Sequence, residues 1–245
     1  MRITVLQWLS EAVTSAPGLS GCHPPGRVVV APQAFKGTIP ATSAAAWISD
    51  AVRTQHAGAV VRVLPMADGG DGTLNALAAA GAYPGPLSAA VRSVGRHAVE
   101  RPCLTERGST VVVELAAACG IALLPDGSTE PMSASTLGLG DAIRAALDRR
   151  PGTLVVCLGG SASTDGGAGM LVALGARLRD ADGADVDPCG ATLASIASVD
   201  LAGLDSRLSS LDVVVAMDVT SPLLGPHGAA RVFSPQKGAT PEQVV

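Results

Sequence analysis

Aromatic residues and an excess of positive charge are both missing from this chain. Only 2% of its 245 residues are aromatic, which argues against the stacking surface that single-stranded nucleic acids require. The formal net charge is -4, so the chain has no general attraction for DNA, RNA or acidic membrane surfaces. No uninterrupted apolar run reaches the roughly 18 residues of a membrane-spanning helix. We therefore expect no nucleic-acid partner and no membrane partner.

Cysteine and histidine form no pattern typical of a metal site or a catalytic triad. The five cysteines include no Cys-x-x-Cys pair and are odd in number, which argues against a zinc site and a disulfide framework. Because free thiols fit a reducing compartment, we expect a cytoplasmic protein. The four histidines are scattered, and none lies near Ser161 or Ser163 in the sequence, so a hydrolase triad is poorly supported.

Two common nucleotide-binding fingerprints are also absent. The sequence has no Gly-x-x-x-x-Gly-Lys-Ser/Thr, and no Gly-x-Gly-x-x-Gly follows the first expected strand. These absences exclude a P-loop enzyme and leave a dehydrogenase-like α/β protein as a weak alternative. The remaining composition, 47% hydrophobic and 16% charged, is that of a globular protein with one large or two ordinary domains.

The chain does contain a glycine-rich segment between an expected strand and an expected helix. Residues 159–169, Gly-Gly-Ser-Ala-Ser-Thr-Asp-Gly-Gly-Ala-Gly, follow the apolar run 154–158 and precede a helical pattern that begins at Met170. Few side chains obstruct such a loop, so its backbone N–H groups could bind an anion such as phosphate. Asp165 is expected to be the N-cap of the helix. The alternative is a sharp turn that uses glycine only for its dihedral angles.

A second loop of the same kind supports the anion-binding interpretation. Strand 60–64 leads into Pro-Met-Ala-Asp-Gly-Gly-Asp-Gly-Thr at 65–73, and a helix is expected over 74–80. Asp68 and Asp71 lie in this loop, so carboxylate oxygens for a cation stand beside backbone N–H groups for phosphates. Both loops follow the carboxyl ends of expected strands, where open α/β sheets bind ligands. The sequence therefore favours a magnesium-nucleotide site.

The order of the expected elements indicates an α/β protein. Further buried strands are expected at 27–31 and 211–216, further helices at 41–55, 116–120, 137–149 and 191–196, and new elements from Phe233 and from Thr240-Pro241. Three strands at 87–94, 97–104 and 110–115 follow one another without a helix. We therefore expect an antiparallel or mixed sheet in a second lobe.

Two lysines and four aspartates are the main candidates for chemistry. Lys36 and Lys237 are the only lysines, and each stands beside a glycine, where it could neutralise a transferring phosphoryl group or bind a carboxylate. The alternative is that both are solvated loop lysines. Asp218 follows the last buried strand, as the other three aspartates follow theirs. Glu114 closes a strand and is interpreted as a polar strand end rather than as a catalytic base.

Seven ordered blocks of the sequence resemble the bacterial-type glycerate kinase family. They are Ala31-Pro32 with Phe35-Lys36-Gly37, and residues 65–72, 114–123, 136–144, 158–175, 216–225 and 233–241. The resemblance implies a two-lobed α/β fold with a flavodoxin-like lobe made from both chain ends and an inserted lobe with a mixed sheet. It divides the chain into an extension at 1–27, a first lobe at 28–82, an inserted lobe at 83–232, and a return to the first lobe at 233–245.

The same resemblance implies ATP-dependent phosphorylation of D-glycerate, with ATP and Mg²⁺ as cofactors and 2-phosphoglycerate as the favoured product. By position, the catalytic candidates are Lys36, Asp165, Asp218 and Lys237. The candidates for binding phosphates and substrate are Asp68, Gly69, Gly70, Asp71, Gly159, Gly160, Ser161, Gly166 and Gly167, with Asp68 and Asp71 as magnesium ligands. Assembly into a homo-oligomer stays open.

Three features depart from the family pattern. Gln33-Ala34 stands where the family usually has Asp-Ser, and Asp71 replaces the commoner Glu. The family's C-terminal portion, with a Gly-Glu-Gly motif, is absent, so we expect an incomplete first lobe. The alternative function is a truncated relative that binds a nucleotide or a partner chain without catalysis.

Overall fold

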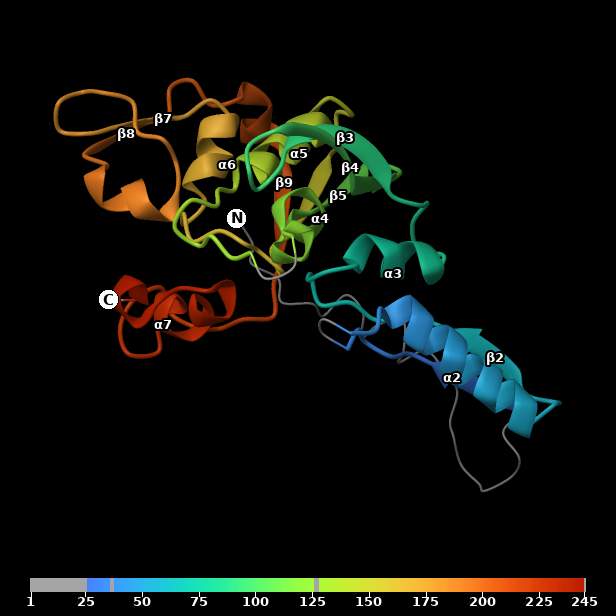
Figure 1. Ribbon diagram of the computed structural model, residues 1–245. Helices are drawn as coiled ribbons and strands as arrows, with labels where there is room; N and C mark the ends of the chain where they lie inside the picture. Colours follow the sequence, from blue (N-terminus) through green and yellow to red (C-terminus); the bar gives the residue numbers. More distant parts are fainter. Residues whose placement is uncertain (1–25, 36–37, 126–127, 245) are drawn as a thin grey trace.

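The computed structural model describes residues 26–35, 38–125 and 128–244, and it has the expected two-lobed α/β architecture (Figure 1). The first lobe is a strand-helix-strand unit. Strands β1 (Arg27–Val30) and β2 (Val60–Val63) pair in parallel, and helix α2 (Ala41–Gln55) joins them. These three elements match the expected ranges closely, because each is bounded by proline, glycine or polar residues.

The second lobe contains a five-stranded mixed sheet in the order β3-β4-β5-β6-β9. Its strands are β3 (Leu87–Arg92), β4 (Ala98–Arg107), β5 (Thr110–Glu114), β6 (Thr153–Cys157) and β9 (Asp212–Ala216). The first three pair antiparallel, and β5, β6 and β9 pair in parallel. The expected mixed sheet is confirmed, and its parallel half places the ends of β5, β6 and β9 at one edge.

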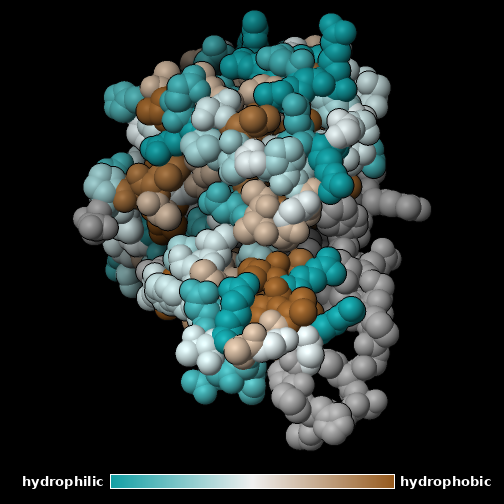
Figure 2. Space-filling model, turned by 90° about the vertical axis from the view of Figure 1, so that its right-hand side faces the viewer, coloured by the Kyte–Doolittle hydropathy of each residue, from teal (hydrophilic) through white to brown (hydrophobic). Residues whose placement is uncertain are grey.

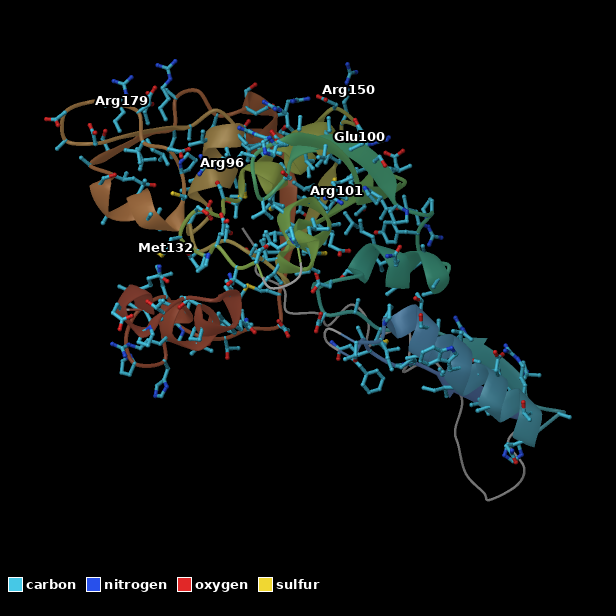
Figure 3. The ribbon with its side chains drawn as sticks, viewed as in Figure 1. Arg96, Glu100, Arg101, Met132, Arg150 and Arg179 are labelled. Atoms are coloured by element: carbon cyan, nitrogen blue, oxygen red, sulfur yellow. The ribbon has the colours of Figure 1, made fainter. Side chains whose placement is uncertain are left out.

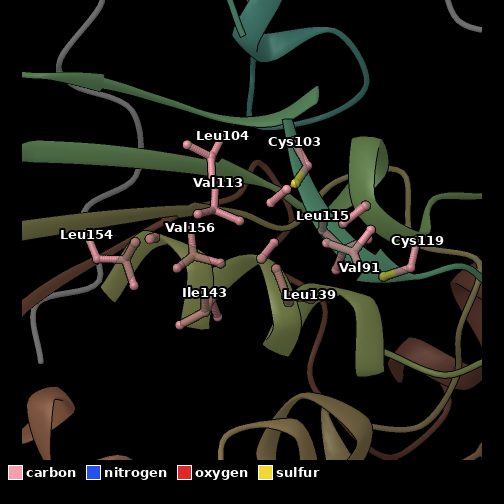
Figure 4. Packing of buried hydrophobic residues seen from close by; sticks show 14 of the residues in the cluster. Val91, Cys103, Leu104, Val113, Leu115, Cys119, Leu139, Ile143, Leu154 and Val156 are labelled. Atoms are coloured by element: carbon pink, nitrogen blue, oxygen red, sulfur yellow. The ribbon is translucent and has the colours of Figure 1, made fainter. Parts of the chain in front are cut away.

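Helices cover both faces of this sheet. Alternate residues of a strand point to opposite faces, and on β5 Val111 and Val113 belong to the main core whereas Val112 belongs to a smaller cluster. The main core lies under α4 (Leu115–Cys119) and α5 (Leu137–Leu147) (Figure 4). The smaller cluster packs the sheet against Leu74 of α3 (Thr73–Ala79).

Helix α3 therefore packs on the sheet of the second lobe, although it lies before residue 83. Helix α3 also contacts α2 of the first lobe, so it lies between the two lobes (Figure 1). The division of the chain at residue 82 stays a prediction.

Close backbone approach fixes the position of α5. A Cβ atom on Gly138 would lie 2.2 Å from the carbonyl oxygen of Arg92, on β3. One on Gly140 would lie 2.5 Å from Cβ of Ala173, the last residue of α6 (Ala168–Ala173). The two glycines therefore let α5 approach the sheet and α6 more closely than any other residue would allow.

The structure also corrects several expectations from the sequence. Phe233 ends helix α7 (Ala229–Phe233) rather than beginning an element, and a helix of five residues is too short to show a periodic pattern. The helix near residue 191 is the 3-10 helix η2 (Gly190–Ser195). The sequence did not predict the ribbon of β7 (Arg177–Arg179) and β8 (Ser198–Asp200), or the 3-10 helix η3 (Ser206–Ser210). The element expected from Phe233 begins two residues later, as the 3-10 helix η4 (Pro235–Lys237). The start at Thr240-Pro241 is confirmed by η5 (Pro241–Val244).

The first lobe leaves large apolar side chains exposed. Val29 on β1, Val60 on β2, and Trp47 and Ile48 on α2 are all more than two-fifths exposed, at 53%, 65%, 62% and 43%. Figure 2 shows a hydrophobic patch in the lower half of the view, which is where the first lobe lies. Among the described residues, no helix is both long enough and apolar enough to cross a membrane.

Candidate functional site

The two glycine-rich loops meet in space, at the edge of the sheet where β6 and β9 end. The amide of Gly159 donates a hydrogen bond to the carbonyl oxygen of Gly69, at 2.9 Å. A Cβ atom on Gly159 would lie 2.5 Å from Cα of Gly70. Gly69 has a φ of +90°, and a Cβ atom there would lie 2.6 Å from the carbonyl oxygen of Ala216, the last residue of β9. The glycines are thus required by the contact between the loops.

Gly160 continues this contact. Its φ is +73°, and a Cβ atom there would lie 2.6 Å from Oδ1 of Asp71 and 2.9 Å from Cβ of Ala116, on α4. Its carbonyl oxygen accepts a hydrogen bond from the amide of Ile121, at 2.9 Å, where the 3-10 helix η1 (Ile121–Leu123) begins. The second loop is therefore held between the Asp71 carboxylate and the segment that follows β5.

Asp68 stabilises the first loop from within. Its Oδ1 atom accepts a hydrogen bond from the amide of Gly70, at 2.9 Å, and its Oδ2 atom accepts one from Nε2 of Gln33. Gln33 is the residue that departs from the family pattern. The side chain of Gln33 carries no charge, so it leaves the negative charge of Asp68 in place. It donates a hydrogen bond to this carboxylate, which we expect to bind the cation.

Asp68 and Asp71 suit a cation that also binds phosphate oxygens. The described residues include no group of three or more His, Cys, Asp or Glu side chains that could hold a metal ion. Mg²⁺ does not need such a group, because it commonly binds one or two carboxylates together with phosphate oxygens and water. Asp71 is exposed and Asp68 is half-buried, so both fit that type of coordination.

Glu114, the last residue of β5, links the first loop to the sheet. Its Oε1 atom accepts a hydrogen bond from the amide of Gly72, and its Oε2 atom one from the amide of Leu74, both at 2.8 Å. The side chain is 3% exposed. Burial raises the pKa of Glu114, and the two amide donors act in the opposite direction. The sequence interpretation as a polar strand end missed this contact, although a carboxylate directly after three valines was its signal.

Asp165 is buried and binds the starts of two helices. Its Oδ2 atom accepts four hydrogen bonds, from the amide and hydroxyl of Thr136, the hydroxyl of Ser135 and the amide of Gly169. Its Oδ1 atom accepts one from the amide of Gly167, at 3.2 Å. The N-cap of α6 is Gly167 rather than Asp165, because the chain makes one more turn, through Gly166 and Gly167, before the helix begins.

Lys237 joins the C-terminal segment to the same loop. Its Nζ atom donates a hydrogen bond to the carbonyl oxygen of Ser163, at 2.6 Å. Burial lowers the pKa of Lys237, and the charge of Asp165 partly opposes that shift. Figure 3 shows Met132, in the loop before α5, at the edge of the second lobe that faces this segment. Ser161 and Ser163, whose hydroxyl oxygens are 2.8 Å apart, lie beside the lysine contact.

The structure thus brings together most of the residues that the sequence singles out. One set surrounds the contact between the loops: Asp68, Gly69, Gly70, Asp71, Gly159, Gly160 and Ser161. A second set lies around Lys237 and Asp165: Ser163 accepts a hydrogen bond from Lys237, and Gly167 donates one to Asp165. Asp218 is exposed, two residues beyond β9, and Gly166 is exposed with a φ of +58°. Lys36 lies outside the described residues.

These observations define a two-lobed α/β protein whose candidate site is a pair of touching glycine loops at the carboxyl edge of a sheet. The family model described as the glycerate kinase family matches residues 28–245. The chain therefore belongs to the glycerate kinase family.

Individual relatives agree with this assignment. A glycerate kinase of Bacillus subtilis (strain 168) is 41% identical over 225 residues, and a glycerate 2-kinase of Escherichia coli (strain K12) is 37% identical over 229 residues. A solved structure from Salmonella typhimurium LT2, assigned as a glycerate kinase 2, is 40% identical with a TM-score of 0.73. Each match covers 89% of this chain but only 57% or 58% of the relative, so the chain spans little more than half their length.

Proposed function

We propose that this protein transfers the γ-phosphate of ATP to a hydroxyl of D-glycerate. The observation that carries the proposal is the direct contact between the two glycine loops, in which Gly159 donates to Gly69. Together the loops form a surface of backbone and small side chains, bordered by the carboxylates of Asp68 and Asp71. Membership of the glycerate kinase family and the names of the relatives support the substrate.

The residues of this surface would bind MgATP as follows. The loops around Gly69-Gly70, Gly159-Gly160-Ser161 and Gly166-Gly167 would surround the triphosphate, and Asp68 and Asp71 would hold the cation. When bound, magnesium would neutralise charge on the phosphate oxygens. The amides of Gly70, Gly159 and Gly167 already donate within the protein, so their present role is to shape the loops.

The catalytic candidates would then have separate roles. Lys237 would neutralise the transferring phosphoryl group by leaving its contact with Ser163. We assign the same charge-neutralising role to Lys36. Asp218 is the better candidate for orienting the attacking hydroxyl, because it is exposed, whereas Oδ2 of Asp165 accepts four hydrogen bonds. Asp165 would keep the second loop in shape.

An ADP-release assay with D-glycerate tests the proposal. We expect ADP release that depends on glycerate and on magnesium, and phosphorus NMR should identify 2-phosphoglycerate, as the name of the E. coli relative suggests. Absence of turnover from a folded chain would contradict the kinase function. If that chain still bound MgATP, the alternative of a nucleotide-binding relative without catalysis would stand. We place the reaction in the cytoplasm, in keeping with four free cysteines among the described residues.

Replacing Lys237 by methionine should lower kcat/KM by at least about tenfold, or about 1.4 kcal/mol. Methionine keeps most of the length of the side chain but removes the charge that would meet the phosphoryl group. The matched control is Arg231→Met, because Arg231 is an exposed cation on α7 of the same segment. The ADP-release assay measures both variants, and equal activities of the two would show that Lys237 has no special role.

A further inference from the structure

We propose that Glu114 is a positioning residue, which holds the loop at 68–73 against the loop at 159–161 so that both meet the triphosphate as one surface. The expected effect of Glu114 on nucleotide binding rests on the proposed function. The contacts that carry the inference do not depend on the nucleotide. They join residues that are 42 and 40 positions apart in the sequence, Gly72 and Leu74 with Glu114.

Placing a carboxylate at this position of the strand has an energetic cost. Glu114 ends a strand whose other buried residues are all valines, Val111, Val112 and Val113. A buried ionised carboxylate loses its hydration and needs hydrogen-bond donors in exchange. An apolar residue here would avoid that loss but would leave the amides of Gly72 and Leu74 without an acceptor. The carboxylate therefore serves to bind these two amides rather than to fill the core.

The donors to the Glu114 carboxylate are backbone amides rather than side chains. Each carboxylate oxygen accepts a backbone N–H from the junction between the first loop and α3. Gly72 has a φ of +82°, so the backbone turns sharply there and has no side chain to stabilise it. Glu114 holds this turn from outside, through its hydrogen bonds to the amides of Gly72 and Leu74.

The second loop is supported by the same part of the sheet. Glu114 is the register partner of Cys157 across the parallel pair β5 and β6, and Gly159 follows Cys157 by two residues. Ala116, two residues after Glu114, borders Gly160. Glu114, which binds the first loop, and Cys157, which precedes the second loop, are therefore neighbours in the same sheet. The hydrogen bond from Gly159 to Gly69 closes the connection.

The variant Glu114→Gln tests this role with little change of shape. Its side-chain amide has one acceptor oxygen, so one of the two backbone amides would face an NH₂ group instead of an oxygen. We expect the KM for MgATP to rise at least about fivefold while kcat changes by less than about twofold, because uniform binding is lost. Hydrogen exchange at the amides of Gly72 and Leu74 should become at least about tenfold faster.

The matched control is Asp141→Asn. Asp141 is also a buried carboxylate of the second lobe, 6% exposed, which accepts hydrogen bonds from the amide and guanidinium of Arg92. A loss of stability lowers the amount of folded enzyme and hence the apparent maximal rate, and leaves KM unchanged. We therefore expect Asp141→Asn to keep the wild-type KM and the wild-type exchange at Gly72 and Leu74.

The outcomes separate this proposal from the proposed function. Wild-type values of KM and of exchange in Glu114→Gln, or an equal rise of KM in Asp141→Asn, would overturn the positioning role. A wild-type chain that binds MgATP in calorimetry but does not phosphorylate glycerate would end the kinase proposal only. The positioning role would then be judged by the affinity for MgATP and the exchange rates. A wild-type chain that does not bind MgATP would overturn both.

Discussion

Replacing Gly159 by alanine should lower kcat/KM for MgATP by at least about tenfold. The new methyl group would lie 2.5 Å from Cα of Gly70 and 2.9 Å from its amide nitrogen, both of them backbone atoms that cannot turn aside. The loops would have to separate, and the hydrogen bond from Gly159 to Gly69 would be lost. Because the contact joins two loops beyond the ends of the strands and is not part of the main core, we expect the fold to survive. Steady-state kinetics with varied MgATP measure the effect.

Gly152→Ala is the control for this variant. Gly152 lies just before β6, as Gly159 lies just after it, so both substitutions add one methyl group at an end of the same strand. At Gly152 the nearest atom would be 3.5 Å away, on Ser109, which is an ordinary contact distance. Near-wild-type kinetics are expected for Gly152→Ala. If Gly159→Ala behaved in the same way, the close contact between the loops would have no part in nucleotide binding.

The second large effect is expected from Asp165→Asn, which should lower the free energy of unfolding by about 3 kcal/mol. The asparagine would present an NH₂ group to donors such as the amide of Thr136, which is 2.7 Å from the carboxylate. Turnover should fall at least about tenfold as well, because the loop that carries Ser163 would lose its support. Denaturant unfolding monitored by circular dichroism measures the first effect.

Asp148→Asn is the matched control for Asp165→Asn. Asp148 follows α5, and its side chain is 70% exposed in an ion pair with Arg207. Exposed pairs contribute little, so a change of less than about 0.5 kcal/mol is expected. An Asp165 variant as stable as this control would mean that the five hydrogen bonds to the carboxylate are not what holds the two helices together.

The sequence predicted the two loops because their signals are local. Glycines and aspartates that separate an apolar run from a helical pattern indicate a strand-to-helix loop without any knowledge of the rest of the chain. The mixed sheet was predictable for a similar reason, since three apolar segments follow one another with only short turns between them. The local pattern also explains the error at α6. Asp165 has the chemistry of an N-cap and does bind the helix amide of Gly169, but two further glycines move the N-cap to Gly167.

The contacts between the loops and their supports could not be predicted, because they join distant parts of the chain. Lys237 reaches a carbonyl oxygen 74 residues away, at Ser163, and nothing in either segment indicates the other. The approach of Gly69 to Ala216 depends on the register of β9 against β6, which a sequence alone does not define. The role of Glu114 depends in the same way on how α3 packs against the sheet.

The central claim is that the two glycine loops bind the triphosphate of MgATP together. The most direct test is an NMR titration of the labelled chain with a non-hydrolysable MgATP analogue, in which the backbone amides of both loops are followed. We expect the amides of Gly69 and Gly70 and those of Gly159 and Gly160 to shift with one common dissociation constant. Shifts confined to one loop, or located elsewhere on the molecule, would contradict the account.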